Sequence, residues 1–318
     1  MAGVHMSLWG SIEWLLNPPT GLSLGLILLI SFILGLLHGA TPDEHTWPIT
    51  FSYAVGAYST RRGMKAGFLF SLGFTLQRAL LTTLGYLGLA YFYQKYNLDG
   101  PVYIIVGVVM AVAGSYVLKG KYVHLEVDRL LRSRTHAREA ERTNLYERLR
   151  DVPLRMTIVH GLIAGFGFGA YATVITFMLA PRVGSLLYAP LPGLMFGLGT
   201  MAMQIAFGAA FAAVVRHNGL GEDAIRKLGA ATAGRTLYYG GLAFMLIGAL
   251  VLLIPPVDRF AISTGLPIPN LDAFGVGLAL VLLVVGVIGV GSMVKAYRDL
   301  RAMARSLSKG LNPTSTGS

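Results

Sequence analysis

Residues 22–48 read LSLGLILLISFILGLLHGATPDEHTWP, an apolar run that ends directly on polar residues. Four side chains of metal-binding type follow the run within eight positions: His38, Asp43, Glu44 and His45. Gly39 and Pro42 lie among them, and proline disfavours helix at the residue before it and removes a backbone donor. The stretch therefore predicts a membrane helix that breaks at Gly39 and Pro42.

The composition favours a membrane protein. Of the 318 residues, 54% are hydrophobic and only 13% are charged, and the mean hydropathy is +0.61. Soluble domains carry about 25% charged residues. The chain has no cysteine, which excludes disulfides and thiolate metal sites. We expect an all-α, polytopic membrane protein.

Seven apolar segments approach the roughly 20 residues that span hydrocarbon. They are 22–39, 66–93, 102–118, 155–180, 191–215, 236–254 and 273–295. Every second connection between them is basic, which predicts an N-terminus outside and a C-terminus inside the inner (cytoplasmic) membrane. The net charge of +11 then comes from loops that face anionic lipid, so no nucleic-acid partner is expected.

Three motifs recur in the same order in the two halves. GFLFSLG at 67–73 returns as GLMFGLG at 193–199, and each is followed by a glutamine. His38-Gly39 returns as His160-Gly161, and a G-x6-G spacing at 107–114 returns at 241–248. Because each half has three spans, the copies enter from opposite sides. Such inverted repeats are typical of secondary transporters.

The chain is accordingly divided into six parts. These are an N-terminal interfacial segment (1–21), a first three-helix repeat (22–118), a cytoplasmic connecting loop (119–153), a second, inverted three-helix repeat (154–254), an extra transmembrane helix with a basic tail (255–309) and a disordered tail (310–318).

The spacing of the two histidines bears on metal binding. In a continuous helix, His38 and His45 would stand about 10 Å apart along the axis, whereas two imidazoles on one ion lie at most about 4 Å apart. One ion could take both only if the segment is unwound. Imidazole with carboxylate suits Ni²⁺, Co²⁺ or Zn²⁺. The candidate metal ligands are His38, Asp43, Glu44, His45 and, as the repeat counterpart of His38, His160.

A structural alternative for the same stretch is a helix N-cap followed by acidic residues in the first turn, with His38 packed and satisfied.

Other polar and methionine side chains are candidates for a substrate pathway: Gln77, Arg78, Tyr171, Thr173, Met201 and Gln204. Arg78 lies near mid-membrane, where a charge needs a partner. Either it pairs with Asp43 or Glu44, or it contacts an anionic substrate.

HGATPDEH at 38–45 and RRGMKAGFLFSLGF at 61–74, with the inverted halves, resemble the nickel/cobalt transporter family of the lysine-exporter superfamily. That family carries a histidine, four residues and Asp-His, then an FSLGH-like segment. Here Glu44 is inserted before the second histidine, and Phe74 stands at the family's later histidine. The resemblance implies metal ligands at His38, Asp43 and His45.

We expect a secondary transporter of a divalent transition-metal ion, with Ni, Co or Zn as substrate and no prosthetic cofactor. No P-loop is present, so transport would use a gradient, with protons as a coupling ion. An enzyme is not expected; membrane lipid is the expected partner, and a homo-oligomer is left open. The alternatives are a small-anion or amino-acid exporter that uses Arg78 and a non-transporting intramembrane metal-dependent enzyme or assembly factor.

Overall fold

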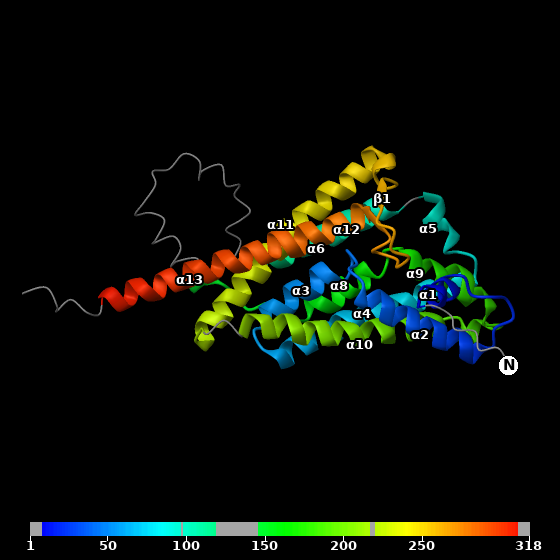
Figure 1. Cartoon of the computed structure of the whole chain (residues 1–318), viewed down its shortest axis with the longest axis horizontal. Helices are drawn as coiled ribbons and strands as arrows, with labels where there is room; N and C mark the ends of the chain where they lie inside the picture. Colours follow the sequence, from blue (N-terminus) through cyan, green and yellow to red (C-terminus); the bar gives the residue numbers. More distant parts are fainter. Residues whose placement is uncertain (1–7, 97, 119–145, 217–219, 311–318) are drawn as a thin grey trace, which may run out of the picture.

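The computed structural model describes residues 8–96, 98–118, 146–216 and 220–310 (Figure 1). The described residues are mostly helical, and they include one small two-stranded sheet. The predicted disordered tail and most of the predicted connecting loop lie outside the described residues.

The first half contains an apolar helix that is interrupted and then continues as a second helix. Its helices are α1 (Leu8–Leu16), α2 (Leu24–Ala40), α3 (Trp47–Gly56), α4 (Thr60–Tyr86), α5 (Tyr91–Tyr96) and α6 (Asp99–Val117). Residues 41–46, which include Pro42, separate α2 from α3, whereas Gly39 lies in the last turn of α2. Every residue of α3 from Pro48 to Gly56 is buried, so the chain continues into the protein interior after the break.

The second half also contains a broken helix. Its elements are α8 (Met156–Ala164), α9 (Ala170–Thr173), the π-helical η2 (Val174–Leu179), the short 3₁₀ turns η3 (Ala180–Arg182) and η4 (Leu186–Tyr188), α10 (Leu191–Arg216) and α11 (Glu222–Leu253). Residues 165–169 interrupt the segment that we expected to be one span over 155–180. Glycines at 165, 167 and 169 explain the interruption, because glycine is a poor helix former.

The C-terminal part contains a small hairpin and a long helix. Its elements are η5 (Pro255–Val257), β1 (Ala261–Ser263), β2 (Ala273–Gly275), α12 (Val276–Val281), the π-helical η6 (Leu282–Val290) and α13 (Gly291–Gly310). The strands pair antiparallel, with Ile262 opposite Phe274. This hairpin corrects the purely helical expectation.

Two helices begin well before the apolar spans that the sequence predicts. α4 begins at Thr60, ahead of the span over 66–93, and α11 begins at Glu222, ahead of the span over 236–254. Ser59 caps α4 by accepting a hydrogen bond from the Arg62 amide (3.3 Å). In α11, Lys227 pairs with Asp223 one turn earlier (2.7 Å). Hydropathy marks where a helix is apolar, whereas caps and ion pairs extend it into the polar region.

The last helix extends beyond the predicted span over 273–295 into the basic tail. α13 continues to Gly310. Asp299 of this helix accepts a hydrogen bond from the Tyr146 hydroxyl (3.2 Å). Burial and the neighbouring Asp299 raise the pKa of Tyr146 to about 12, which keeps the hydroxyl as a donor. The contact holds the residues before α8 against α13.

Four of the described helices are long and apolar enough to cross a membrane: Asp99–Val117, Leu186–Arg216, Glu222–Leu253 and Val276–Arg305. α2 is apolar but shorter, at 17 residues. Large apolar side chains face outward from these helices; Leu246 is 70% exposed and Val287 is 68% exposed. Both features indicate a membrane protein in contact with lipid.

Glycines allow the helices to pack at backbone distance. α4 packs against α10, α6 against α11, α2 against α10 and α8 against α4. A Cβ on Gly35 would overlap the carbonyl oxygen of Phe196, and one on Gly107 would lie 2.5 Å from the carbonyl oxygen of Gly241. Small residues at helix crossings are the usual means of association in membranes.

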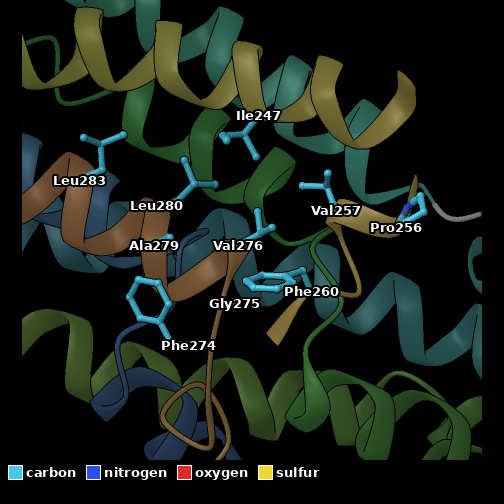
Figure 2. Close-up of a pocket in the computed structure, with 10 residues that line it drawn as sticks. All are labelled: Ile247, Pro256, Val257, Phe260, Phe274, Gly275, Val276, Ala279, Leu280 and Leu283. Atoms are coloured by element: carbon cyan, nitrogen blue, oxygen red, sulfur yellow. The ribbon is translucent and has the colours of Figure 1, made fainter. Parts of the chain in front are cut away.

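The larger of the two main pockets is apolar and lies between α11 and α12. It has a volume of about 480 Å³. Figure 2 shows Ile247 of α11 facing Leu280 and Leu283, with the rings of Phe260 and Phe274 below them. A pocket lined by such side chains offers no ligand for an ion.

The crossing of α2 and α10 is tested by a matched pair of glycine substitutions in one helix. We expect Gly35→Ala to lower the free energy of unfolding by about 1–3 kcal/mol, because its methyl group would meet backbone that cannot move cheaply. Gly25→Ala in the same helix meets nothing within 4 Å and should be neutral or stabilising. Thermal unfolding of the detergent-solubilised variants is the measurement. Equal stability of the two variants would contradict the close crossing.

Candidate functional site

The first break gathers three potential ligands. Asp43, Glu44 and His45 each offer one ligand atom, and these atoms lie within 4.8 Å of one another. Asp43 also organises the backbone of the break, because its carboxylate accepts a hydrogen bond from the His45 amide (2.9 Å). Its carbonyl oxygen accepts from the amides of Thr46 (3.2 Å) and Trp47 (3.0 Å). The break is thus a hydrogen-bonded turn that presents consecutive side chains to one point.

His45 is held in place by an acid and an aromatic ring. Its Nδ1 lies 3.3 Å from Glu44 Oε1, and its ring stacks on Tyr103 of α6 at 5.3 Å between centroids. The Tyr103 hydroxyl donates to the same Glu44 oxygen (3.2 Å). His45 Nε2 is buried and has no hydrogen-bond partner in the described part of the chain. Glu44 and Tyr103 therefore fix the orientation of the His45 ring.

His38 lies beside this group rather than within it. Its Nδ1 is 3.8 Å from Asp43 Oδ2. Its ring packs between Phe74 (5.5 Å) and Phe196 (5.1 Å), which come from α4 and α10. Its Nε2 is buried, and no described residue forms a hydrogen bond with it. Asp43 therefore links His38 to the other potential ligands.

The second break packs directly against the first. A Cβ on Gly167 would lie 2.5 Å from His45 Nδ1, so the His45 ring rests on a residue without a side chain. One on Gly165 would overlap the side-chain oxygen of Gln77. The glycines of residues 165–169 thus make room for side chains of the candidate site.

Arg78 joins α4 to the second break. Its Nη2 donates to the carbonyl oxygen of Gly167 (2.7 Å), and its guanidinium lies over the rings of Phe74 (4.7 Å) and Phe196 (5.7 Å). It also acts electrostatically on Asp43. This placement fits a charge that fixes the second break beside the carboxylates; a salt bridge with Asp43 or Glu44 stays a prediction.

The other predicted pathway residues lie at different depths. Gln77 and Gln204 are buried, and neither end of their amides bonds to a described residue. Tyr171 is buried with its ring edge toward His38, at 6.0 Å. Thr173 donates to the carbonyl oxygen of Gly169 (3.1 Å), and Met201 is half-buried on α10. Gln77, Gln204 and Tyr171 therefore remain the stronger candidates.

His160 lies apart from the three grouped ligands. Its Nδ1 is 3.2 Å from the Tyr53 hydroxyl of α3 and 3.0 Å from the carbonyl oxygen of Met156. The Tyr53 contact joins α8 to α3, and the Met156 contact lies within α8 one turn earlier, so the structure accounts for His160 as a packing residue. Its Nε2 is buried without a partner among the described residues.

Sequence analysis missed two residues of this site. Tyr103 lies near the start of an apolar helix, where nothing in the local pattern distinguishes it from a packing residue. Gly167 belongs to the glycine-rich stretch at 165–169, but the stretch does not show which glycine meets the site. Contact between the two breaks is a tertiary feature, and neither break specifies it alone.

The role of Arg78 is tested by Arg78→Met, which keeps the length of the side chain and removes the donor. A hydrogen bond from a charged group contributes about 1.5–3 kcal/mol, so we expect amide hydrogen exchange over 165–169 to rise roughly 10- to 150-fold. Arg62→Met on the same helix, where the guanidinium bonds to the Tyr58 hydroxyl, should leave that exchange unchanged. Unaltered protection in Arg78→Met would show that Arg78 does not hold the break.

Comparison with known proteins identifies no relative. No family model matches the chain, and no curated protein or solved structure matches it. The resemblance to the nickel/cobalt transporter family therefore stays an expectation carried by the motif residues, and function must be inferred from the geometry of the two breaks.

Proposed function

We propose that the chain is a secondary transporter that moves a divalent transition-metal ion across the cytoplasmic membrane. The observation that carries the proposal is the grouping of Asp43, Glu44 and His45 within 4.8 Å at a break in a helix packed among membrane-spanning elements. Ionisable residues at such a place are rare and are by default functional. The metal ion is the substrate, and no prosthetic group is needed.

The ligand set suits such an ion. Two carboxylates and an imidazole favour first-row metals such as Ni²⁺, Co²⁺ and Zn²⁺ over Mg²⁺ or Ca²⁺. Ligands at about 2.1 Å from one ion stand at most about 4 Å apart, so a separation of 4.8 Å requires a contraction of less than 1 Å. His38 can join through a small movement, because its Nδ1 is 3.8 Å from Asp43.

Reciprocal helix contacts support an inverted repeat. A Cβ on Gly35 would meet Phe196, and a Cβ on Gly161 would meet Phe70. Adding 126 to residue number 35 gives 161, and adding 126 to 70 gives 196, so the second contact is the first with the two halves exchanged. The contact of Gly67 with Gln204 corresponds in the same way to the contact of Gly193 with Arg78, because Gly193 is 126 residues after Gly67 and Gln204 is 126 residues after Arg78. Two halves related by a twofold axis would exchange contacts in this way.

These contacts also revise the expected register of the repeat. A separation of 126 pairs His38 with Ala164 and His160 with Leu34, whereas the sequence match of His38 with His160 used 122. On this register the counterpart of Arg78 is Gln204. His160 then lies one helical turn from the counterpart of His38, which agrees with its separate contacts.

The seven predicted crossings can be built from the described helices. α2 with α3, and α8 with α9 and η2, would each form one broken crossing. α4, α6, α10, α11 and the helix from α12 to α13 would complete the set, with the N-terminus outside and the C-terminus inside. Two facing broken helices at a repeat interface are a common site of substrate binding and alternating access.

Protons are the proposed coupling ion. Metal ligands must be deprotonated to bind, so an ion that enters the Asp43, Glu44 and His45 group would compete with protons there. Release of the ion on one side could then be linked to proton uptake on the same side.

Metal binding by this group is tested with Asp43→Ala and His45→Ala. We expect each to weaken Co²⁺ binding by at least about 100-fold, since even residues that only support a ligand typically contribute 10- to 100-fold. Titration of the purified protein measures binding, and proteoliposomes measure flux. Asp223→Ala, an exposed acid on α11, is the control.

Unchanged flux of Ni²⁺, Co²⁺ and Zn²⁺ in both ligand variants would end the metal proposal. Flux of a small anion that requires Arg78, without metal binding, would support the exporter instead.

A second test uses glycine substitutions in the other break. Gly167→Ala would place a methyl group against His45, whereas Gly169→Ala meets nothing closer than 3.8 Å. We expect Gly167→Ala to weaken Co²⁺ binding about tenfold or more by displacing the imidazole, and Gly169→Ala to leave it unchanged. Equal affinities would mean that His45 does not bind the ion in the observed arrangement.

A further inference from the structure

A second, polar pocket adjoins the candidate metal site. It has a volume of about 260 Å³ and is lined by residues from the first break, the start of α9, the hairpin and α12. Its polar lining side chains are Glu44, Asn270 and Asp272, and none of its lining residues is cationic. Glu44 therefore belongs both to this pocket and to the group with Asp43 and His45.

The loop of the hairpin is fixed over the first break. Asn270 Nδ2 donates to Thr41 Oγ1 (3.1 Å), directly after the end of α2. Asn270 has a φ of 70°, a left-handed conformation that asparagine tolerates better than most residues. The carbonyl oxygen of Asp272 accepts a hydrogen bond from the Thr264 amide (2.9 Å), which ties this residue across the loop. These hydrogen bonds hold the loop in place as one side of the pocket.

The position of the pocket relates it to one membrane side. The hairpin lies toward the end of the molecule that carries α1 and α5, away from the C-terminal end of α13 (Figure 1). With the proposed C-terminus inside, this is the outer side. The neighbouring apolar pocket between α11 and α12 (Figure 2) has no polar side chain and cannot serve an ion.

The volume and the lining suit a hydrated cation. Water occupies about 30 Å³ per molecule in the liquid, so a divalent ion with its six waters fits within 260 Å³. Two carboxylates and an amide oxygen can accept hydrogen bonds from such waters. A pocket lined by one sign of charge also raises the local concentration of the opposite ion.

We propose that this pocket is the outer vestibule of the transporter, where a hydrated divalent cation is held by Asp272, Asn270 and Glu44 before it loses water. Glu44 then passes the ion to Asp43 and His45, since its carboxylate belongs to both places. The inference rests on the proposed metal transport and adds the residues that select the ion at the entrance.

The vestibule is tested by Asp272→Asn in proteoliposomes, with external Co²⁺ as the probe. We expect the Co²⁺ concentration for half-maximal flux to rise about three- to tenfold, with maximal flux unchanged, because one carboxylate near a divalent ion has an effect of that order. The difference from wild type should shrink at high ionic strength, where exposed charges are screened. A merely structural role for Asp272 would not produce this salt dependence.

Asp258→Asn is the matched control. Asp258 lies in the same connection between α11 and α12 but does not line the vestibule, so Asp258→Asn should raise the half-saturating Co²⁺ concentration clearly less than Asp272→Asn.

A second pair of variants displaces Glu44 without removing its charge. A Cβ on Gly277 would lie 2.5 Å from Glu44 Oε2, whereas a Cβ on Gly286 meets nothing within 4 Å. We expect Gly277→Ala, and not Gly286→Ala, to slow Co²⁺ flux at least about threefold.

The outcomes separate the two proposals. Normal wild-type flux with identical half-saturation in Asp272→Asn and Asp258→Asn would overturn the vestibule and leave metal transport standing. Absence of Co²⁺ binding and flux in the wild-type protein would overturn both. A rise in half-saturation that persists at high salt would also overturn the electrostatic role of Asp272.

Discussion

Backbone groups within a bilayer must find partners inside the protein, and this requirement explains how the two breaks are built. An interrupted helix leaves amides and carbonyls that water cannot satisfy at depth. In the first break, the carboxylate and the carbonyl of Asp43 accept hydrogen bonds from the amides of residues 45–47. In the second, Arg78 supplies a charged donor to the carbonyl of Gly167. Residues that could bind substrate therefore also hold the fold together.

Close glycine packing makes this arrangement possible. The crossings of α4 with α10 and of α6 with α11 bring backbones together at glycines, which leaves little space for side chains between the helices. The polar pocket lies at the first break, and His38 is held just before that break between Phe74 and Phe196. Tight helix crossings and a small polar centre are thus consequences of the same composition, rich in glycine and poor in charge.

Sequence reasoning located what depends on local chemistry. Gly39 and Pro42 predicted the first break, because proline and glycine act within a few residues of themselves. The charged starts of α4 and α11 were missed, since hydropathy does not register capping by Ser59 or the pair of Asp223 with Lys227. Contacts across the molecule, such as Tyr103 with Glu44 and Gly167 with His45, depend on how helices distant in sequence meet. Nothing in either local stretch specifies them.

The balance of charge explains why an arginine lies beside a proposed cation site. With neutral histidines, ionised Asp43 and Glu44 together with Arg78 give this centre a net charge of −1, and a bound divalent ion would bring it to +1. Without Arg78 the same centre would alternate between −2 and 0. Uncompensated charge is costly in a low-dielectric interior, and the electrostatic cost rises steeply with its magnitude. With Arg78, the net charge of the centre is thus limited to one unit in both states. Binding of a single proton to the empty site would bring its net charge of −1 to zero. On the proposed function, the inserted Glu44 and the buried Arg78, which distinguish this chain from the motif it resembles, would form one electrostatic unit: the extra acid would supply a ligand, and the arginine would keep the emptied site stable.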